Sequence, residues 1–192
     1  MLRTRWMWMG FVALVGVALV ASAVYAKEEA KAKVELPEAV AAAVRAACPG
    51  AEIDKVDVEK EAGITLYDIE FKPGQGEIEV AEDGTIIDVT TIVQMKDVPE
   101  AAAKAIQKAA EGATIKQLEK AEVRAEIQKE GEKGKIVKLD KPKYVFEAEL
   151  VKGDQEGEIA VAPDGTIVEE LKWKAKGAPD KEDAEKGKSE KK

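Results

Sequence analysis

The chain has 192 residues, of which 30 are Lys or Arg and 38 are Asp or Glu, so its formal net charge is −8. It contains no His and no Asn, its only Ser residues are Ser22 and Ser189, and its only Cys is Cys48. One chain therefore cannot supply a Ser–His or Cys–His nucleophile pair, a zinc site of the usual Cys/His kind, or an internal disulfide.

The N-terminal segment has the pattern of a secretory signal peptide. Arg3 and Arg5 precede an uncharged, mostly apolar stretch over residues 6–26, which ends in small residues just before Lys27. We expect cleavage after Ala26, and therefore a periplasmic or secreted protein. The alternative is a retained membrane anchor, because these 21 residues are just long enough to span a bilayer of roughly 30 Å.

A short helix is predicted next, because Pro37 suits the first turn of a helix and Pro49-Gly50 would end it. Cys48 lies at its end, and we expect a small half-buried residue there, with a disulfide between two chains as the alternative. The predicted apolar stripe of this helix consists of Leu36, Val40, Val44 and Ala47.

Strands are predicted to follow the helix. Tyr67, Ile69 and Phe71 alternate with Asp68 and Glu70, which indicates an antiparallel sheet with one apolar face and one polar face. The turn at residues 83–84 is Asp-Gly, a strong hairpin signal. The predicted strands cover residues 53–59, 64–72, 77–81 and 85–91.

An internal repeat organises the rest of the chain. Residues 76–88 return as residues 157–169 with nine of thirteen positions identical, 81 residues further on. The earlier Leu-Pro-Glu-Ala of residues 36–39 returns as Val-Pro-Glu-Ala at residues 98–101, only 62 residues further on. The second copy therefore carries 19 extra residues.

The extra residues fit a lengthened hairpin at about residues 123–142, which we expect to protrude, either as a recognition loop or as a plain solvated turn. A helix over residues 118–128 is the competing interpretation. After it, Tyr144, Phe146 and Ala148 alternate with Glu147 and Glu149, as in the first copy.

The sequence thus predicts an α+β protein of two tandem units, each one helix packed on a four-stranded antiparallel sheet. We expect the two sheets to join edge to edge, or the units to pack on each other. The charged C-terminal segment, residues 174–192, begins just after Trp173 and has no apolar residue larger than Ala. We therefore expect a disordered tail. The predicted parts are a signal peptide or anchor (1–26), a linker (27–35), unit 1 (36–93), unit 2 (97–173) and the tail (174–192).

This ordered series resembles the PepSY-like domain, which includes β-lactamase-inhibitor-like proteins of bacteria. The resemblance rests on Leu-Pro-Glu-Ala, Pro-Gly-Ala-x-Ile, Tyr-x-Ile-x-Phe and Ile-x-Val-x-x-Asp-Gly-Thr-Ile, and covers residues 36–89 and 98–173. It implies an exported protein that binds or inhibits other proteins, with a tandem sheet that offers a concave binding surface. The family supplies no catalytic residue to carry over.

The polar sheet face is the predicted binding surface, because acids opposite one another on neighbouring strands repel unless something neutralises them. Docking of a basic partner or of Ca²⁺ is one interpretation, and a solvated face is the other. Trp173 is added as a possible interface anchor, with packing against the sheet as its alternative. The candidate residues are Asp68, Glu70, Glu77, Glu79, Glu147, Glu149 and Trp173, and Glu158 lies on the same face.

The predicted function is that of an exported, non-catalytic module that binds an extracytoplasmic protein, with inhibition or modulation of an enzyme such as a peptidase or β-lactamase as the predicted role. The alternative is an acidic structural or cation-binding envelope protein. We predict no catalytic residue, no cofactor and no metal ligand. Removal of residues 1–26 makes the net charge −10, which argues against nucleic acid as a partner. A membrane is a partner only if the N-terminal segment is retained.

Overall fold

The computed structural model describes residues 35–131 and 133–177. The predicted signal peptide, nearly all of the predicted linker and most of the predicted tail lie outside these residues. From Leu36 onward, the described residues belong to one compact unit. In the part of the chain that is described, no helix is long and apolar enough to cross a membrane.

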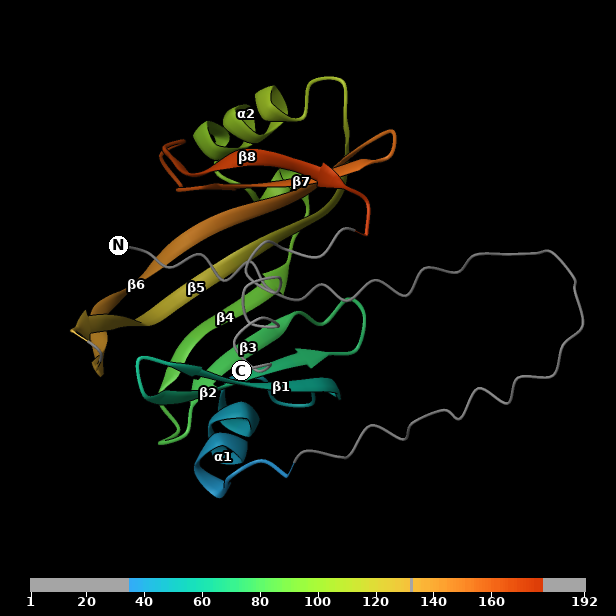
Figure 1. The fold of residues 1–192 in the computed structure, drawn as a ribbon. Coiled ribbons are helices and arrows are strands. Elements are labelled where there is room, and N and C mark those ends of the chain that lie inside the picture. The colour runs from blue at the N-terminus through green and yellow to red at the C-terminus, as the bar shows by residue number, and fades with distance from the viewer. Residues whose placement is uncertain (1–34, 132, 178–192) are drawn as a thin grey trace, which may run out of the picture. The chain divides into compact units, whose positions relative to one another are not determined.

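Two short helices and eight strands make up this unit (Figure 1). Helix α1 begins directly after Pro37 and helix α2 directly after Pro99, as their sequences predict. The helices and strands are α1 (Glu38–Ala47), β1 (Ile53–Glu61), β2 (Ile64–Phe71), β3 (Glu77–Ala81), β4 (Ile86–Ile92), a 3₁₀ turn η1 (Met95–Asp97), α2 (Glu100–Ala109), β5 (Thr114–Glu130), β6 (Lys133–Lys152), β7 (Gln155–Val161) and β8 (Ile167–Ala175).

All eight strands form one antiparallel sheet in the order β1-β2-β3-β4-β5-β6-β7-β8. The prediction of an α+β protein with two tandem units, each one helix on a four-stranded sheet, is therefore wrong: the structure is a mostly β protein with a single sheet. The expected edge-to-edge join between the two sets of strands is present. The two halves are joined where β4 pairs with β5, from Asp88 opposite Val123 to Ile92 opposite Glu119.

The join has a simple physical cause. A strand at the edge of a four-stranded sheet would leave one row of N–H and C=O groups without partners. Strand β5 has 17 residues and pairs with β4 along one edge and with β6 along the other. The repeat in the sequence shows where strands start and end, but it carries no information about which strand ends a sheet.

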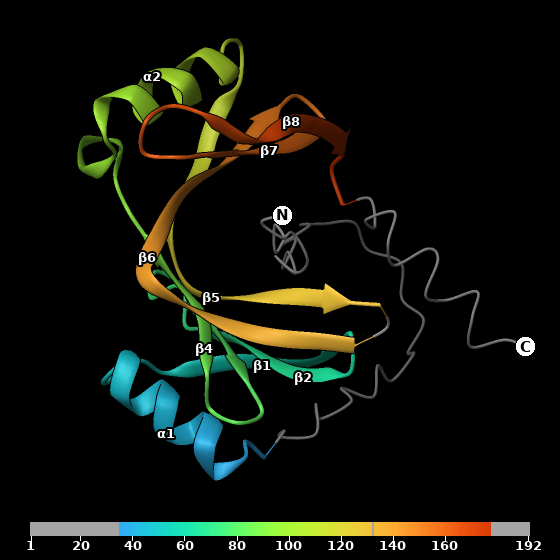
Figure 2. The same ribbon diagram turned by 90° about the vertical axis from the view of Figure 1, so that its left-hand side faces the viewer.

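Both helices cover the same face of the sheet, which bends so that they lie on its outer side (Figure 2). Val40 and Val44 of α1 pack on Ile69 and Ile78 in the first half of the sheet. Ala102 and Ile106 of α2 pack on the second half in the same way. The apolar stripe predicted for the first helix is thus the face that it buries. We call the opposite side of the sheet the helix-free face.

The sequence predicted that the long hairpin of β5 and β6 would protrude, but in the structure it does not. Its end packs on the helix-free face of the first half, where Ala125 joins Leu66, Ala81 and Ile87 in a third apolar cluster. The backbone N–H of Gly134 donates to the carbonyl of Ala62 over 2.7 Å. The extra residues of the second copy therefore brace the first half of the sheet. The competing helical interpretation of residues 118–128 is wrong, because β5 covers them.

Replacement of Gly134 by Val is expected to destabilise the protein by about 1–3 kcal/mol through overpacking. A Cβ atom at this position would lie 2.9 Å from Cβ of Ala62 and 3.0 Å from Cδ1 of Ile64, closer than side chains pack. Urea denaturation measures the effect. Lys135→Val is the matched control, because Lys135 is a neighbouring exposed residue of the same strand. Equal stability of the two variants would contradict the packing of the hairpin on β2.

Candidate functional site

Strand register places carboxylates opposite one another across the helix-free face. In the first half of the sheet, Asp68 of β2 lies opposite Glu79 of β3, which in turn lies opposite Asp88 of β4. Glu70 lies opposite Glu77 in the next row. Since cross-strand neighbours have Cβ atoms about 5 Å apart, these acids form a band of like charge.

The second half of the sheet repeats the arrangement. Glu119 of β5 lies opposite Glu147 of β6, and Glu149 of β6 lies opposite Glu158 of β7. The structure therefore brings all six predicted acids onto one face. Three of the six, Asp68, Glu79 and Glu149, are buried, with 7–9% of each residue's surface exposed, whereas Glu70, Glu77 and Glu147 are half-buried.

Trp173 is not part of this face. It lies opposite Gly157 on β7, between the positions of Glu156 and Glu158, so it points to the helix side of the sheet. There it packs against the core beneath α2, and its Cε3 atom lies 2.8 Å from where a Cβ of Gly157 would be. Trp173 therefore packs against the sheet, which was the alternative to its role as an interface anchor. We leave Trp173 out of the proposed surface.

A lysine bridges two carboxylates in the first half. The Nζ atom of Lys55 lies 2.5 Å from Oδ2 of Asp57 and 3.1 Å from Oε1 of Glu70. Burial lowers the pKa of Lys55, but hydrogen bonds to both acids outweigh it and leave the pKa above its usual value. Lys55 follows a bulge in β1, where the register shifts between Ile53 and Lys55.

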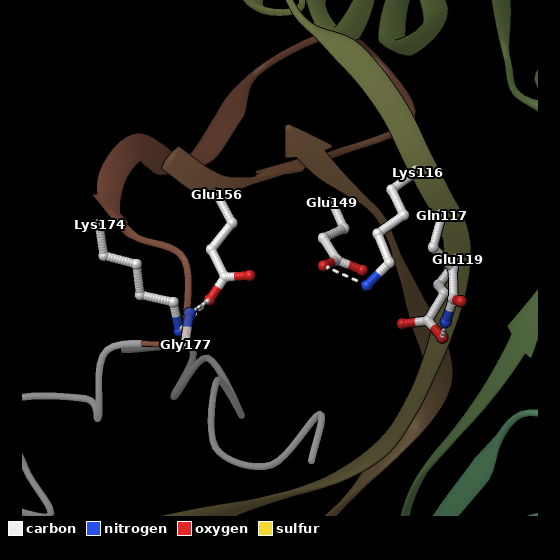
Figure 3. Close-up of polar contacts among 7 residues, drawn as sticks. All are labelled: Lys116, Gln117, Glu119, Glu149, Glu156, Lys174 and Gly177. Atoms are coloured by element: carbon white, nitrogen blue, oxygen red, sulfur yellow. Dashed lines mark hydrogen bonds and ion pairs between the residues drawn. The ribbon is translucent and has the colours of Figure 1, made fainter. Parts of the chain in front are cut away.

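The second half has a related cluster, shown in Figure 3. Lys116 lies in a bulge of β5, and its Nζ donates to Oε1 of Glu149 over 2.9 Å. The amide of Gln117 donates to Oε1 of Glu119 over 2.8 Å. Oε2 of Glu149 is buried and accepts no hydrogen bond from the described residues.

Glu158 is the most perturbed acid of this cluster. Burial, together with the charges of Glu147, Glu149 and Glu119, raises the pKa of Glu158 from its ordinary value of 4.5 to about 9, against a lowering effect of Lys174. The neighbouring Glu156 is held by the backbone N–H of Gly177 at 3.2 Å. At neutral pH, Glu158 is therefore a neutral carboxyl group among charged ones.

The sequence interpretation missed several members of these clusters. Lys55 and Lys116 carried no signal, because a bulge changes the face that a residue occupies and cannot be read from alternation. Asp88 lies in β4 after a bulge, where Val80 pairs with Ile86 but Glu79 pairs with Asp88, so simple alternation from Ile86 would have put it on the other face. Glu119 lay in the segment for which helix and strand interpretations competed.

No group of three or more acids or cysteines among the described residues is arranged so that it could hold a metal ion. Cys48 follows the last residue of α1 and is half-buried. Burial raises the pKa of its thiol, against the opposing charge of Arg124. A disulfide between two chains stays a prediction.

No protein-family model matches the sequence, and no curated protein does. Solved structures of several Bacteroides proteins are similar to this chain in backbone. A DUF2874 family protein from Bacteroides uniformis is 15% identical with a TM-score of 0.48, over 72% of this chain and 90% of that one. A BLIP-like protein from Bacteroides fragilis is 10% identical with a TM-score of 0.47, over 78% and 94%. A Bacteroides eggerthii protein with a provisional periplasmic description is 10% identical with a TM-score of 0.49, over 73% of this chain and 90% of that one.

At these values the similarity carries no argument about function, and the PepSY-like resemblance stays a prediction.

Proposed function

We propose that this protein is an exported, non-catalytic module that binds a protein partner through the helix-free face of its sheet. The observation that carries the proposal is the band of cross-strand acids, from Asp68, Glu79 and Asp88 in the first half to Glu119 and Glu147 in the second. Like charges held opposite one another destabilise a sheet, so a protein that keeps them gains most from a partner of opposite charge.

The sequence agrees with this role. The N-terminal pattern of a signal peptide places the protein outside the cytoplasm, and the PepSY-like resemblance implies binding or inhibition of another protein. An extracytoplasmic enzyme such as a peptidase or a β-lactamase is the partner class that we propose.

The test is capture of a specific protein from an envelope extract on the immobilised protein, followed by reconstitution with the purified partner. A fourfold Glu→Gln variant at Glu70, Glu77, Glu147 and Glu149 is expected to lose the partner, because it removes charge from the helix-free face. The matched control carries the same change at four exposed acids elsewhere, Glu38, Glu82, Glu100 and Glu170. Equal capture by both variants would refute the proposed surface.

A further inference from the structure

We propose that strand β1, at one edge of the sheet, is a self-complementary interface through which two copies of this chain pair. In this pair the two β1 strands run antiparallel about a two-fold axis at Asp57 and join the two sheets into one. The inference goes beyond the proposed function and does not depend on it. It is carried by two observations: the edge of β1 is open and bears an exposed apolar residue, and the order of side chains along β1 is complementary to itself.

Strand β1 leaves the whole of one edge open in the part of the chain that is described. It covers Ile53–Glu61 and pairs with β2 alone. Helix α1 packs on Ile69 of β2 and Ile78 of β3, and 47% of Val58 in β1 stays exposed. An open edge presents a row of N–H and C=O groups, and a strand from another molecule can pair with them.

The turn after β1 shows which backbone groups face outward. The two residues of the turn at 62–63 have positive φ values of +48° and +83°, as in a tight two-residue hairpin. The residues that flank such a turn, Glu61 and Ile64, form a hydrogen-bonded pair, and the pattern alternates along the strand from there. Val56 and Val58 therefore direct their N–H and C=O groups away from β2, toward an incoming strand.

One antiparallel register matches these groups between two copies. With Asp57 on the two-fold axis, Val56 of each copy lies opposite Val58 of the other. Both valine pairs lie on the helix side of the sheet, since Val58 lies opposite the core residue Tyr67. Cross-strand pairs of β-branched residues stabilise a sheet, and this pairing covers the exposed surface of Val58.

The charges along β1 agree with the same register. Asp54, the extra residue of the β1 bulge, and Lys60 are both exposed, and within the described residues neither has an ion-pair partner. In the proposed pair, Asp54 of each copy lies opposite Lys60 of the other, so the two-fold axis produces this contact twice. A register with Val56 or Val58 on the axis loses both contacts.

The one like-charge pair in this register is Asp57 with its own copy at the axis. The Nζ atom of Lys55 lies 2.5 Å from Oδ2 of Asp57, so each of the two carboxylates brings its own cation to the axis. The repulsion between the two Asp57 side chains is therefore largely offset within each copy.

Charge exchange tests the register, with sedimentation velocity of the purified protein as the measurement. Lys60→Glu places acids opposite one another and Asp54→Lys places lysines opposite one another, so each variant alone is expected to dimerise about tenfold more weakly than the wild type. An equimolar mixture of the two variants restores both opposite-charge pairs in a heterodimer and is expected to recover wild-type association. Lys138→Glu and Glu170→Lys are the matched controls, because both are exposed residues on other strands.

Cross-linking tests the position of the axis. Cys48 is first replaced by Ala, so that no native thiol remains. Asp57→Cys in this background places two thiols in a close, non-hydrogen-bonded pair, and they are expected to form a disulfide between two copies under mild oxidation. Glu59→Cys is the matched control, because the two copies of residue 59 lie four residues apart along the strands, roughly 13 Å, and are expected not to cross-link. A non-reducing gel distinguishes the two.

The outcomes decide the interface without deciding the proposed function. Weaker association of both charge variants, recovery in their mixture and cross-linking at residue 57 support the interface. A wild type that stays monomeric up to about 0.1 mM, equal association of test and control variants, or cross-linking at residue 59 instead of 57 would overturn it. Because the two-fold axis is perpendicular to the sheet, both helix-free faces lie on the same side of the pair, which then offers two copies of the proposed partner surface.

Discussion

Replacement of Glu158 by Gln is expected to stabilise the protein at about pH 8 and to leave its stability almost unchanged at about pH 4. The pKa of Glu158 is raised from 4.5 in an ordinary setting to about 9 in the folded protein, chiefly by burial and by the charges of Glu147 and Glu149. Between these two values the folded state keeps a proton that the unfolded state gives up. The contribution of Glu158 to stability is therefore greatest below its unfolded pKa of 4.5 and is lost as the pH rises through its folded pKa of about 9.

Glutamine resembles the neutral carboxyl group at every pH, so the variant escapes this loss. We expect a gain of about 2 kcal/mol at about pH 8, after a discount for the part of the side chain that stays in water. Urea denaturation at the two pH values measures it, and ¹³C NMR titration of the Glu158 carboxyl gives the pKa directly. Glu170→Gln is the matched control, because Glu170 is exposed and its variant should show no such pH dependence. A Glu158 carboxyl that titrates near its ordinary value would contradict the expectation.

Replacement of Ile69 by Ala is expected to lower the unfolding temperature of the whole sheet, including the half that does not contain it. Ile69 is fully buried beneath α1, and loss of such a side chain typically costs about 2–5 kcal/mol. Trp173 packs in the core beneath α2 and so reports on the other half. Because β4 and β5 are paired within one sheet, both halves should unfold in a single transition.

The measurement is the thermal transition followed by Trp173 fluorescence and by circular dichroism. Trp6 and Trp8 are replaced by Phe in the background, so that Trp173 is the only source of the signal. Ile53→Ala is the control, since 44% of Ile53 is exposed and its loss should cost little. If Ile69→Ala left the Trp173 transition in place while part of the circular dichroism signal was lost at lower temperature, the two halves would be independent.

Local elements of the fold could be predicted because their signals are local. Pro37 and Pro99 set the starts of both helices, and the residues at helical spacing after them are the ones that become buried, Val40 and Val44 in α1, and Ala102 and Ile106 in α2. The alternation in Tyr67 to Phe71 predicted both the strand and the face on which its acids lie. A side chain's direction in a strand follows from position alone, so this inference needs no tertiary information.

Pairing between distant strands could not be predicted in the same way. The repeat left two arrangements open, an edge-to-edge join of the two sheets or packing of the two units on each other, and the structure shows the join, with β5 paired to β4 as well as to β6. Hydrogen bonds between strands join backbone groups, which are the same for every residue, so the sequence does not show which edges meet. The hairpin end was also misplaced, since only the fold shows that Ala125 lies over Leu66 and Ala81.

In the candidate site, too, some features follow from the sequence alone and others only from the tertiary structure. The composition by itself excluded the usual nucleophile pairs and zinc sites, and the alternating acids by themselves selected one sheet face. Only the tertiary structure placed Trp173 on the other face and revealed that two bulges put Lys55 and Gln117 at equivalent positions. The physical reason is that charge and alternation are properties of single residues and short segments, whereas the burial of Glu149 and the raised pKa of Glu158 depend on neighbours that three strands bring together.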